Sequence, residues 1–121
     1  MNKQGGCLCG QVRYEVSGEP LAVVVCHCKN CQKQSRSTFS INLIGQSEQI
    51  ALQGKLSTFA DKNDTGDPVN RKFCADCGSP IYSEILSQGN LIALKVGTLD
   101  DTSDIEPVSY THLTLPTIYS V

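Results

Sequence analysis

Short segments in which apolar and polar residues alternate dominate the first half of the chain. Residues 11–16 and 38–44 both alternate, which is typical of a strand with one buried face. Residues 21–25 form a continuous apolar run, which predicts a buried strand. Turn-forming residues separate these segments, such as Ser-Gly-Glu-Pro at 17–20. The pattern therefore predicts a series of short strands.

The second half of the chain continues in the same way, with one helical segment in between. Further strand candidates are residues 49–52, 56–60, 69–73, 81–86 and 91–96. The last two are joined by Gln-Gly-Asn at 88–90, a hairpin signal. Residues 30–37 are polar and lack Gly and Pro, which predicts one or two helical turns. Many short strands with one helical signal predict a mainly β, mostly antiparallel domain.

Length and charge narrow the classes of partner. The chain has 121 residues, which fits one domain, and its 40% hydrophobic and 18% charged residues argue against disorder. No apolar stretch approaches the ~20 residues of a membrane-spanning helix. The formal net charge of −2 gives no electrostatic basis for binding nucleic acid. We therefore expect no membrane and no nucleic-acid partner.

Seven cysteines are the unusual feature of the composition. They form three clusters: Cys7-Leu8-Cys9, Cys26-His27-Cys28-Lys29-Asn30-Cys31 and Cys74-Ala75-Asp76-Cys77. An odd number cannot pair completely in disulfides, and residues 1–6 lack the layout of a signal peptide. We therefore expect a cytoplasmic protein, in whose reducing environment clustered cysteines bind metal or carry out chemistry.

The number and spacing of the cysteines suggest two metal sites. Structural zinc takes four protein ligands, whereas catalytic zinc takes three and keeps a position open. The simplest division of seven is a closed site of Cys7, Cys9, Cys74 and Cys77 and an open site of Cys26, Cys28 and Cys31. A zinc ribbon of Cys28, Cys31, Cys74 and Cys77 is an alternative partition. The same cysteines could also hold an iron–sulfur cluster, form a redox-active CxxC pair or bind metal in a purely structural role.

Three basic residues follow the second cluster. Lys29, Lys33 and Arg36 are spaced so that they share one face of a helix. They are candidates for contacting an anionic thiol ligand. The alternative is an ordinary solvated charged face.

The cysteines and their neighbours resemble a known family. The residues that carry the resemblance are Gly6-Cys7-Leu8-Cys9-Gly10 with Val12 and Tyr14, Cys26-His27-Cys28 with Cys31-Gln32-Lys33, Phe73-Cys74 with Cys77-Gly78-Ser79-Pro80 and Tyr82, and Gly97-Thr98-Leu99-Asp100-Asp101. Together they are similar to the glutathione-dependent formaldehyde-activating (GFA) enzyme family, which includes centromere protein V. The resemblance implies a β-tent fold of several small antiparallel sheets with two zinc ions per chain. It places structural zinc on Cys7, Cys9, Cys74 and Cys77 and catalytic zinc on Cys26, Cys28 and Cys31.

The resemblance also implies an activity. It is that of a carbon–sulfur lyase, which forms or cleaves S-hydroxymethylglutathione from formaldehyde and glutathione. His27 lies between two zinc ligands, where it is a candidate proton carrier; the alternative is a packed or exposed structural histidine. The second hypothesis is a non-catalytic structural or partner-binding zinc module, as centromere protein V suggests.

The C-terminal segment departs from the family pattern. After Asp101 the family usually continues with an aromatic strand, often bearing His and Trp, but this chain has no Trp. Residues 108–121 lack any acidic residue, Lys or Arg, and resemble the translation of a sequencing adaptor. We expect a zinc-binding domain at 1–108 and an atypical tail at 109–121 that is not native, in which His112 has no role. The alternative is a natural tail that adds a last edge strand.

Overall fold

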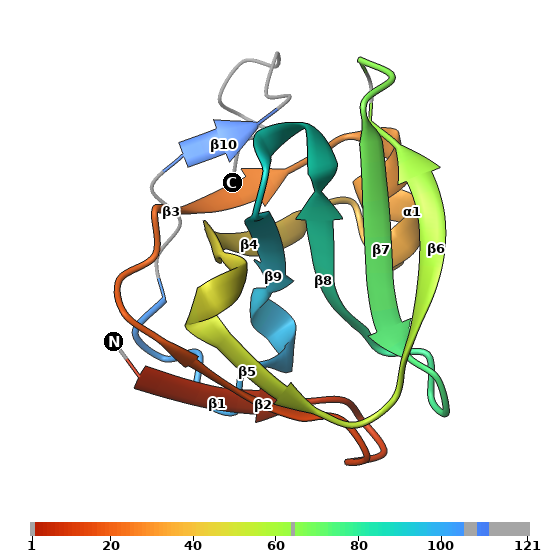
Figure 1. Ribbon diagram of the computed structural model, residues 1–121. Helices are drawn as coiled ribbons and strands as arrows, with labels where there is room; N and C mark the ends of the chain where they lie inside the picture. The colour runs from red at the N-terminus through yellow and green to blue at the C-terminus, as the bar shows by residue number, and fades with distance from the viewer. Residues whose placement is uncertain (1, 64, 106–108, 112–121) are drawn as a thin grey trace.

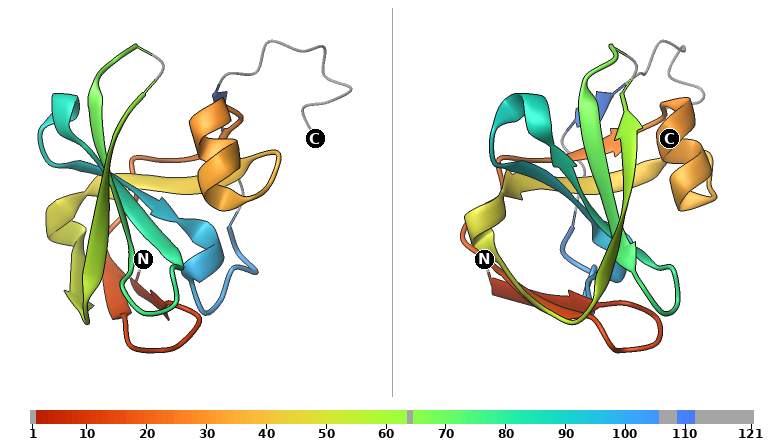
Figure 2. Two further views of the ribbon diagram at one scale, coloured as in Figure 1. Left: turned by 90° about the vertical axis from the view of Figure 1, so that its right-hand side faces the viewer. Right: turned by 45° about the vertical axis from the view of Figure 1, so that its right-hand side comes forward.

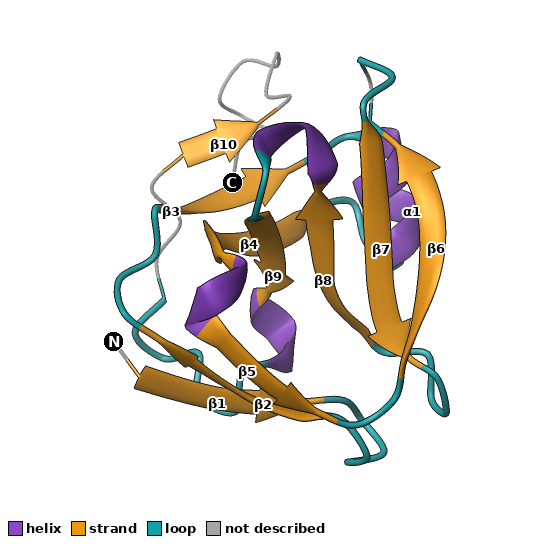
Figure 3. Ribbon diagram, viewed as in Figure 1, coloured by secondary structure: helices purple, strands orange, loops and turns teal. Residues whose placement is uncertain are grey.

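The computed structural model describes residues 2–63, 65–105 and 109–111 (Figure 1). The strands of this part are β1 (Asn2–Gly6), β2 (Arg13–Ser17), β3 (Ala22–Cys26), β4 (Ser40–Gln46), β5 (Ile50–Gln53), β6 (Leu56–Lys62), β7 (Pro68–Cys74), β8 (Pro80–Ile85), β9 (Leu91–Lys95) and β10 (Ser109–Thr111). Its helices are α1 (Lys29–Ser35) and the 3-10 helices η1 (Ser47–Gln49), η2 (Leu86–Gln88) and η3 (Val96–Thr98). Figure 3 shows how strongly strands predominate, as the sequence pattern predicted.

The strands form two sheets. The small sheet has the order β1-β2-β5, and the large sheet has the order β10-β3-β4-β9-β8-β7-β6. All of the paired strands run antiparallel except β10, which lies parallel to β3. In both views of Figure 2, α1 lies at the upper end of the molecule, and β1 and β2 lie at the lower end. The predicted fold class, several antiparallel strands with one short helix, is confirmed.

The hydrophobic core lies between the two sheets. Alternation along β2 buries Tyr14 and Val16 and leaves Arg13 exposed, so one face of the small sheet is apolar. These side chains join a cluster with Leu43 and Leu94 from the middle of the large sheet. Leu43 and Leu94 are direct partners across β4 and β9, so they lie on the same face.

The opposite face of the large sheet carries a group of polar side chains. Asn42 and Lys95 are also partners across β4 and β9, each one residue from a core leucine. Ser83 on β8 and Arg71 on β7 are paired in the same way. Because successive side chains of a strand point to opposite faces, the large sheet separates the apolar core from a face on which these polar side chains are grouped among apolar ones.

Some elements differ from the predicted ones. The strand over β1 was not predicted, because its sequence, Asn-Lys-Gln-Gly-Gly, does not alternate; it forms by pairing along its whole length with β2. The strand predicted at 38–44 begins and ends two residues later, so that it runs through Gly45. The short strand β10 belongs to the segment after residue 108, whereas His112 and the rest of the C-terminal segment lie outside the described residues. The domain boundary at 108 stays a prediction. Within the described residues, no helix is long and apolar enough to cross a membrane.

Candidate metal centres

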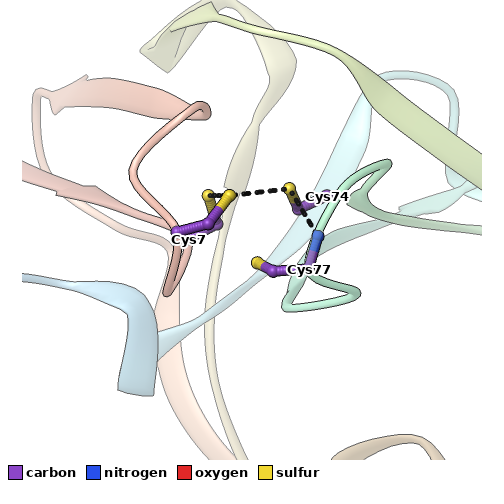
Figure 4. Close-up of side chains that lie close together, drawn as sticks. Cys7, Cys74 and Cys77 are labelled. Carbon is purple, nitrogen blue, oxygen red and sulfur yellow. Dashed lines mark hydrogen bonds between the residues drawn. The ribbon is translucent and has the colours of Figure 1, made fainter.

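Four cysteines from the two ends of the domain meet at one place. Cys7 and Cys9 lie in the turn between β1 and β2, Cys74 ends β7, and Cys77 lies in the turn that follows. Their sulfur atoms all lie within 4.8 Å of one another. Figure 4 shows the labelled side chains of Cys7, Cys74 and Cys77 converging from the two turns. The distance between sulfur atoms is 3.6 Å for Cys7 and Cys9, and 3.7 Å for Cys9 and Cys74.

Backbone amides surround these sulfur atoms. The amide of Val12 donates to Cys7 Sγ at 3.3 Å, and the amides of Asp76 and Cys77 donate to Cys74 Sγ at 3.3 and 3.4 Å. The second turn is tight because Gly78 takes a φ of +80°, which glycine adopts without strain. Hydrogen bonds of this kind favour the charged thiolate, which is the form that binds metal.

Ser79 links the two turns of the four-cysteine site. Its hydroxyl oxygen accepts a hydrogen bond from the amide of Leu8 at 3.0 Å and lies 3.1 Å from Cys77 Sγ. The hydrogen bond from Ser79 lowers the pKa of the Cys77 thiol to about 5. For Cys74, burial raises the pKa, but the donors around its sulfur outweigh burial and the pKa is lowered. The pKa is therefore lowered for Cys77 and Cys74, which favours their thiolates, whereas the pKa of Cys9 is raised.

The other three cysteines form a second, local cluster. Cys26 ends β3, Cys28 caps the N-terminus of α1, and Cys31 lies buried in the first turn of that helix. Their sulfur atoms lie within 4.8 Å of one another. The amide of Cys31 donates to Cys28 Sγ at 3.2 Å, so the helix cap itself orients one of the sulfurs. The hydrogen bond with Cys26, and then burial, raises the pKa of Cys31.

Both clusters fit a tetrahedral thiolate metal. A Zn–S bond of about 2.3 Å implies about 3.8 Å between tetrahedral sulfurs, close to the two distances in the four-cysteine site. The same distances are far too long for disulfides, and all seven cysteines are free. Within the described residues, no His, Asp or Glu atom joins either group. The two clusters could therefore hold metal ions with four and three protein ligands, the partition expected from the cysteine count rather than the zinc-ribbon alternative.

The three-cysteine cluster opens onto a cavity of about 230 Å³. Cys26, Cys28 and Cys31 form one side of it. The large sheet forms the other side and contributes four buried polar side chains, Asn42, Ser83, Arg71 and Lys95, among apolar side chains such as Ile44 and Val69. A ligand bound at these sulfurs would therefore meet two cations and two neutral polar groups.

The structure separates the basic residues predicted next to this site. Lys33 is exposed on α1 and lines a neighbouring cavity of about 360 Å³, together with Arg71 and Phe59. Lys29 is exposed, and its ammonium group donates to the side chain of Gln32. Arg36 lies just beyond the end of α1 with a left-handed φ of 59°, so it does not continue the helical face. The three side chains therefore do not form one row beside the cysteines.

His27 lies between two of the clustered cysteines. Its ring centroid is 6.1 Å from that of Phe39. Its Nε2 atom is buried, and it has no hydrogen-bond partner among the residues that the structure describes. An imidazole nitrogen in this position is compatible with the role of proton carrier expected from the sequence, which stays a prediction.

Sequence reasoning missed the two cations that line the cavity. Lys95 ends the otherwise apolar segment Leu-Ile-Ala-Leu-Lys of β9, and a lysine inside such a run was the signal available. Arg71 stands in β7, where alternation also places it on a buried face. Neither residue is near Cys26, Cys28 and Cys31 in the sequence, so only the sheet pairing brings them to this site.

The overall fold has a relative of known structure. The crystal structure of a Rhodobacter sphaeroides protein from a structural genomics programme superposes with a TM-score of 0.67 at 22% sequence identity. The match covers 89% of this chain and 99% of the other, which shows that the two share a fold. The family described as "Glutathione-dependent formaldehyde-activating enzyme" matches residues 2–114. With both cysteine clusters assembled inside that range, the chain belongs to the glutathione-dependent formaldehyde-activating enzyme family.

Proposed function

We propose that this protein is a zinc-dependent carbon–sulfur lyase that forms or cleaves a thiol adduct of the S-hydroxymethylglutathione type. Two zinc ions per chain would be held, one by Cys7, Cys9, Cys74 and Cys77 and one by Cys26, Cys28 and Cys31. The observation that carries the proposal is the composition of this cluster. It has three cysteines and, among the described residues, no fourth protein ligand, and it faces a cavity. Catalytic zinc sites typically have three protein ligands and one position for substrate.

The chemistry at the three-cysteine site is that of a thiol and an aldehyde. A metal held by three thiolates would stabilise an incoming thiol as its thiolate. The cavity would hold this sulfur beside the carbonyl carbon of the aldehyde. The bimolecular reaction then becomes effectively unimolecular, which lowers its entropic cost. Microscopic reversal cleaves the adduct.

The site has two neighbouring cavities, and each has a size that suits one part of glutathione. A cavity of about 230 Å³ is smaller than the roughly 300 Å³ at which pockets for whole drug-sized ligands begin. It therefore suits the thiol end of the substrate and the aldehyde. Arg71 also lines the neighbouring cavity of about 360 Å³ beside Lys33. The remainder of a tripeptide thiol would extend past Arg71 toward Lys33, which keeps Lys33 as a contact for an anionic group.

The test is the substitution Cys28→Ser in the zinc-loaded protein. We expect the metal content to fall from about two to about one ion per chain, with the fold retained and glutathione binding lost. Metal analysis, circular dichroism and calorimetric titration with glutathione measure these three results, and NMR follows formation of S-hydroxymethylglutathione by the unsubstituted protein. Unchanged metal content would contradict the assignment of this site. A wild-type protein that binds both metals but never forms the adduct would favour the non-catalytic zinc module instead.

A further inference from the structure

The buried polar side chains of this protein gather at one place. In the part of the chain that the structure describes, the buried polar or charged residues are Ser40, Asn42, Arg71, Ser83 and Lys95. Four of them line the cavity of the three-cysteine cluster. The fifth, Ser40, accepts a hydrogen bond from Lys95 Nζ at 3.0 Å. Burying polar groups costs free energy, so a cluster of them beside a cavity points to a ligand.

The two cations of this cavity differ in their partners. Arg71 Nε forms an ion pair with Asp61 Oδ2 at 3.0 Å, and its guanidinium also donates to Ser83 at 3.4 Å. Lys95 is 7% exposed, and the described residues place no carboxylate within ion-pair distance of it. Burial lowers the pKa of Lys95, while the nearby Cys31, Cys26 and Cys28 raise it, so the negative charge that this ammonium group meets is that of the three-cysteine cluster. Arg71 therefore has a carboxylate partner, whereas Lys95 faces the cysteine site.

The hydrogen bond to Ser40 also orients Lys95. The Ser40 hydroxyl accepts from Lys95 and donates to Asn42 Oδ1 at 3.2 Å, so its direction is fixed from both sides. An ammonium group has three N–H donors, and Ser40 is the hydrogen-bond acceptor that the described residues provide. The remaining donors are available to a ligand in the cavity.

We propose that Lys95 is a catalytic residue that donates a hydrogen bond to the substrate oxygen on the carbon that bonds to sulfur. This inference rests on the function proposed above and adds the group that stabilises the oxygen. In the forward reaction the thiol proton is released and the sulfur attacks the aldehyde carbon. The C–S bond forms, the π bond of the carbonyl breaks, and its electron pair moves to oxygen. That oxygen, hydrogen-bonded to Lys95, then takes up one proton, so no net proton is gained or lost.

A cation fixed in a desolvated cavity suits this task. Charge develops on the oxygen only as the C–S bond forms, and donors that are already oriented stabilise it without reorganising. If an exposed lysine of α1 made the same interaction, the surrounding solvent would weaken it. The site should thereby favour sulfur ligands with an oxygen close to the sulfur, such as the hydroxymethyl oxygen of the adduct, because such an oxygen reaches Lys95 while the sulfur lies at the cysteines.

The test compares two small thiols of matched size on the zinc-loaded protein. Mercaptoacetate carries an oxyanion next to the carbon bonded to sulfur, and 2-mercaptoethanol carries a neutral hydroxyl in its place. Calorimetry should show that the wild-type protein binds mercaptoacetate at least about tenfold more tightly than 2-mercaptoethanol. This ratio corresponds to the free energy of one charge-assisted hydrogen bond. The substitution Lys95→Met should abolish this preference, because it weakens the binding of mercaptoacetate much more than that of 2-mercaptoethanol, and it should keep both metals. Lys95→Arg should retain part of the preference, and Lys55→Met, an exposed lysine, should retain all of it.

Several results would overturn the proposal. If the wild-type protein shows no preference for mercaptoacetate, that result is sufficient to overturn the proposal, even if Lys95→Met does not fold. Loss of metal or of 2-mercaptoethanol binding in Lys95→Met would show that Lys95 only balances the charge of the cysteines. A lower melting temperature in that variant would indicate a structural role, because replacing a buried charge that has no carboxylate partner with Met should not destabilise the fold. The lyase proposal fails separately, if the wild type shows the Lys95-dependent preference but forms no S-hydroxymethylglutathione.

Discussion

Both cysteine clusters offer thiolate ligands, but they differ in which parts of the chain supply those ligands. The four-cysteine site joins residues 65 positions apart, as in Cys9 and Cys74, so it fastens the small sheet to the end of the large one. Its sulfurs are met by backbone amides from both turns. The three-cysteine site lies within a single short segment and faces a cavity. The difference teaches that ligands from distant turns stabilise a fold, whereas local ligands beside buried polar groups leave room for substrate.

The largest effect that tests this difference is expected from Cys74→Ser. Cys74 is buried at the four-cysteine site, and structural zinc supplies about 10–16 kcal/mol in small zinc domains. Because whole domains are stable by only about 5–15 kcal/mol, we expect the variant to lose most of its folded population. Circular dichroism and amide NMR spectra measure this. The matched control is Cys28→Ser at the other site, and equal loss of fold in the two variants would end the distinction between them.

Stepwise removal of metal should separate the two sites without any substitution. The three-cysteine site has fewer ligands and an open side, so a chelator should take its metal first. We expect glutathione binding to disappear after the loss of about one metal ion per chain, while the circular dichroism spectrum persists. The second ion should leave together with the folded structure. Simultaneous loss of both ions and the fold in one transition would contradict this order.

A smaller effect is expected from Ser79→Ala in the four-cysteine site. The pKa of Cys77 is lowered from an ordinary 9.0 to about 5, first by the hydrogen bond from Ser79. A thiol with a lowered pKa contributes stability that is complete above its ordinary pKa and is lost as the pH falls toward 5. Removing the hydroxyl raises that pKa, so protons compete with the metal at higher pH.

The measurement is metal release on acidification, followed with a zinc-sensitive dye. We expect the midpoint for the four-cysteine site in Ser79→Ala to move to higher pH, and Ser87→Ala, an exposed serine of η2, to behave as wild type. A midpoint that does not move, or that moves to lower pH, would show that Ser79 does not favour the Cys77 thiolate. The three-cysteine site should release its metal at the same pH in both variants.

The sequence predicted most of the strands because their apolar periodicity is local. Segments such as 11–16 and 38–44 alternate, and their counterparts β2 and β4 have one face in the core. The polar strand β1 could not be predicted, because its stability comes from pairing with β2 and not from its own side chains. The same holds for the short strand β10, which pairs with β3.

The candidate site divides in a similar way. The spacing of Cys26, Cys28 and Cys31 indicated a local three-ligand cluster, because residues so close in sequence can turn onto one ion. The helical spacing of Lys29, Lys33 and Arg36 suggested neighbouring cations. Lys29 and Lys33 do lie one turn apart on α1, but the helix ends at Ser35 and Arg36 takes a left-handed conformation beyond it. The cations of the cavity come from the sheet instead.

By itself, the sequence determined the fold class and the family resemblance, and it favoured the division of the cysteines into four and three. The strands and the three-cysteine cluster follow from periodicity and short-range spacing, which are properties of the local chain, whereas the four-cysteine site assembles only in the folded structure. Only the tertiary structure decided that Lys95 and Arg71 lie beside the three cysteines. Their position depends on the register of β9 and β7 in the large sheet. Register is set by which strands pair across the whole chain, and a shift of one residue would have turned both cations toward the apolar core.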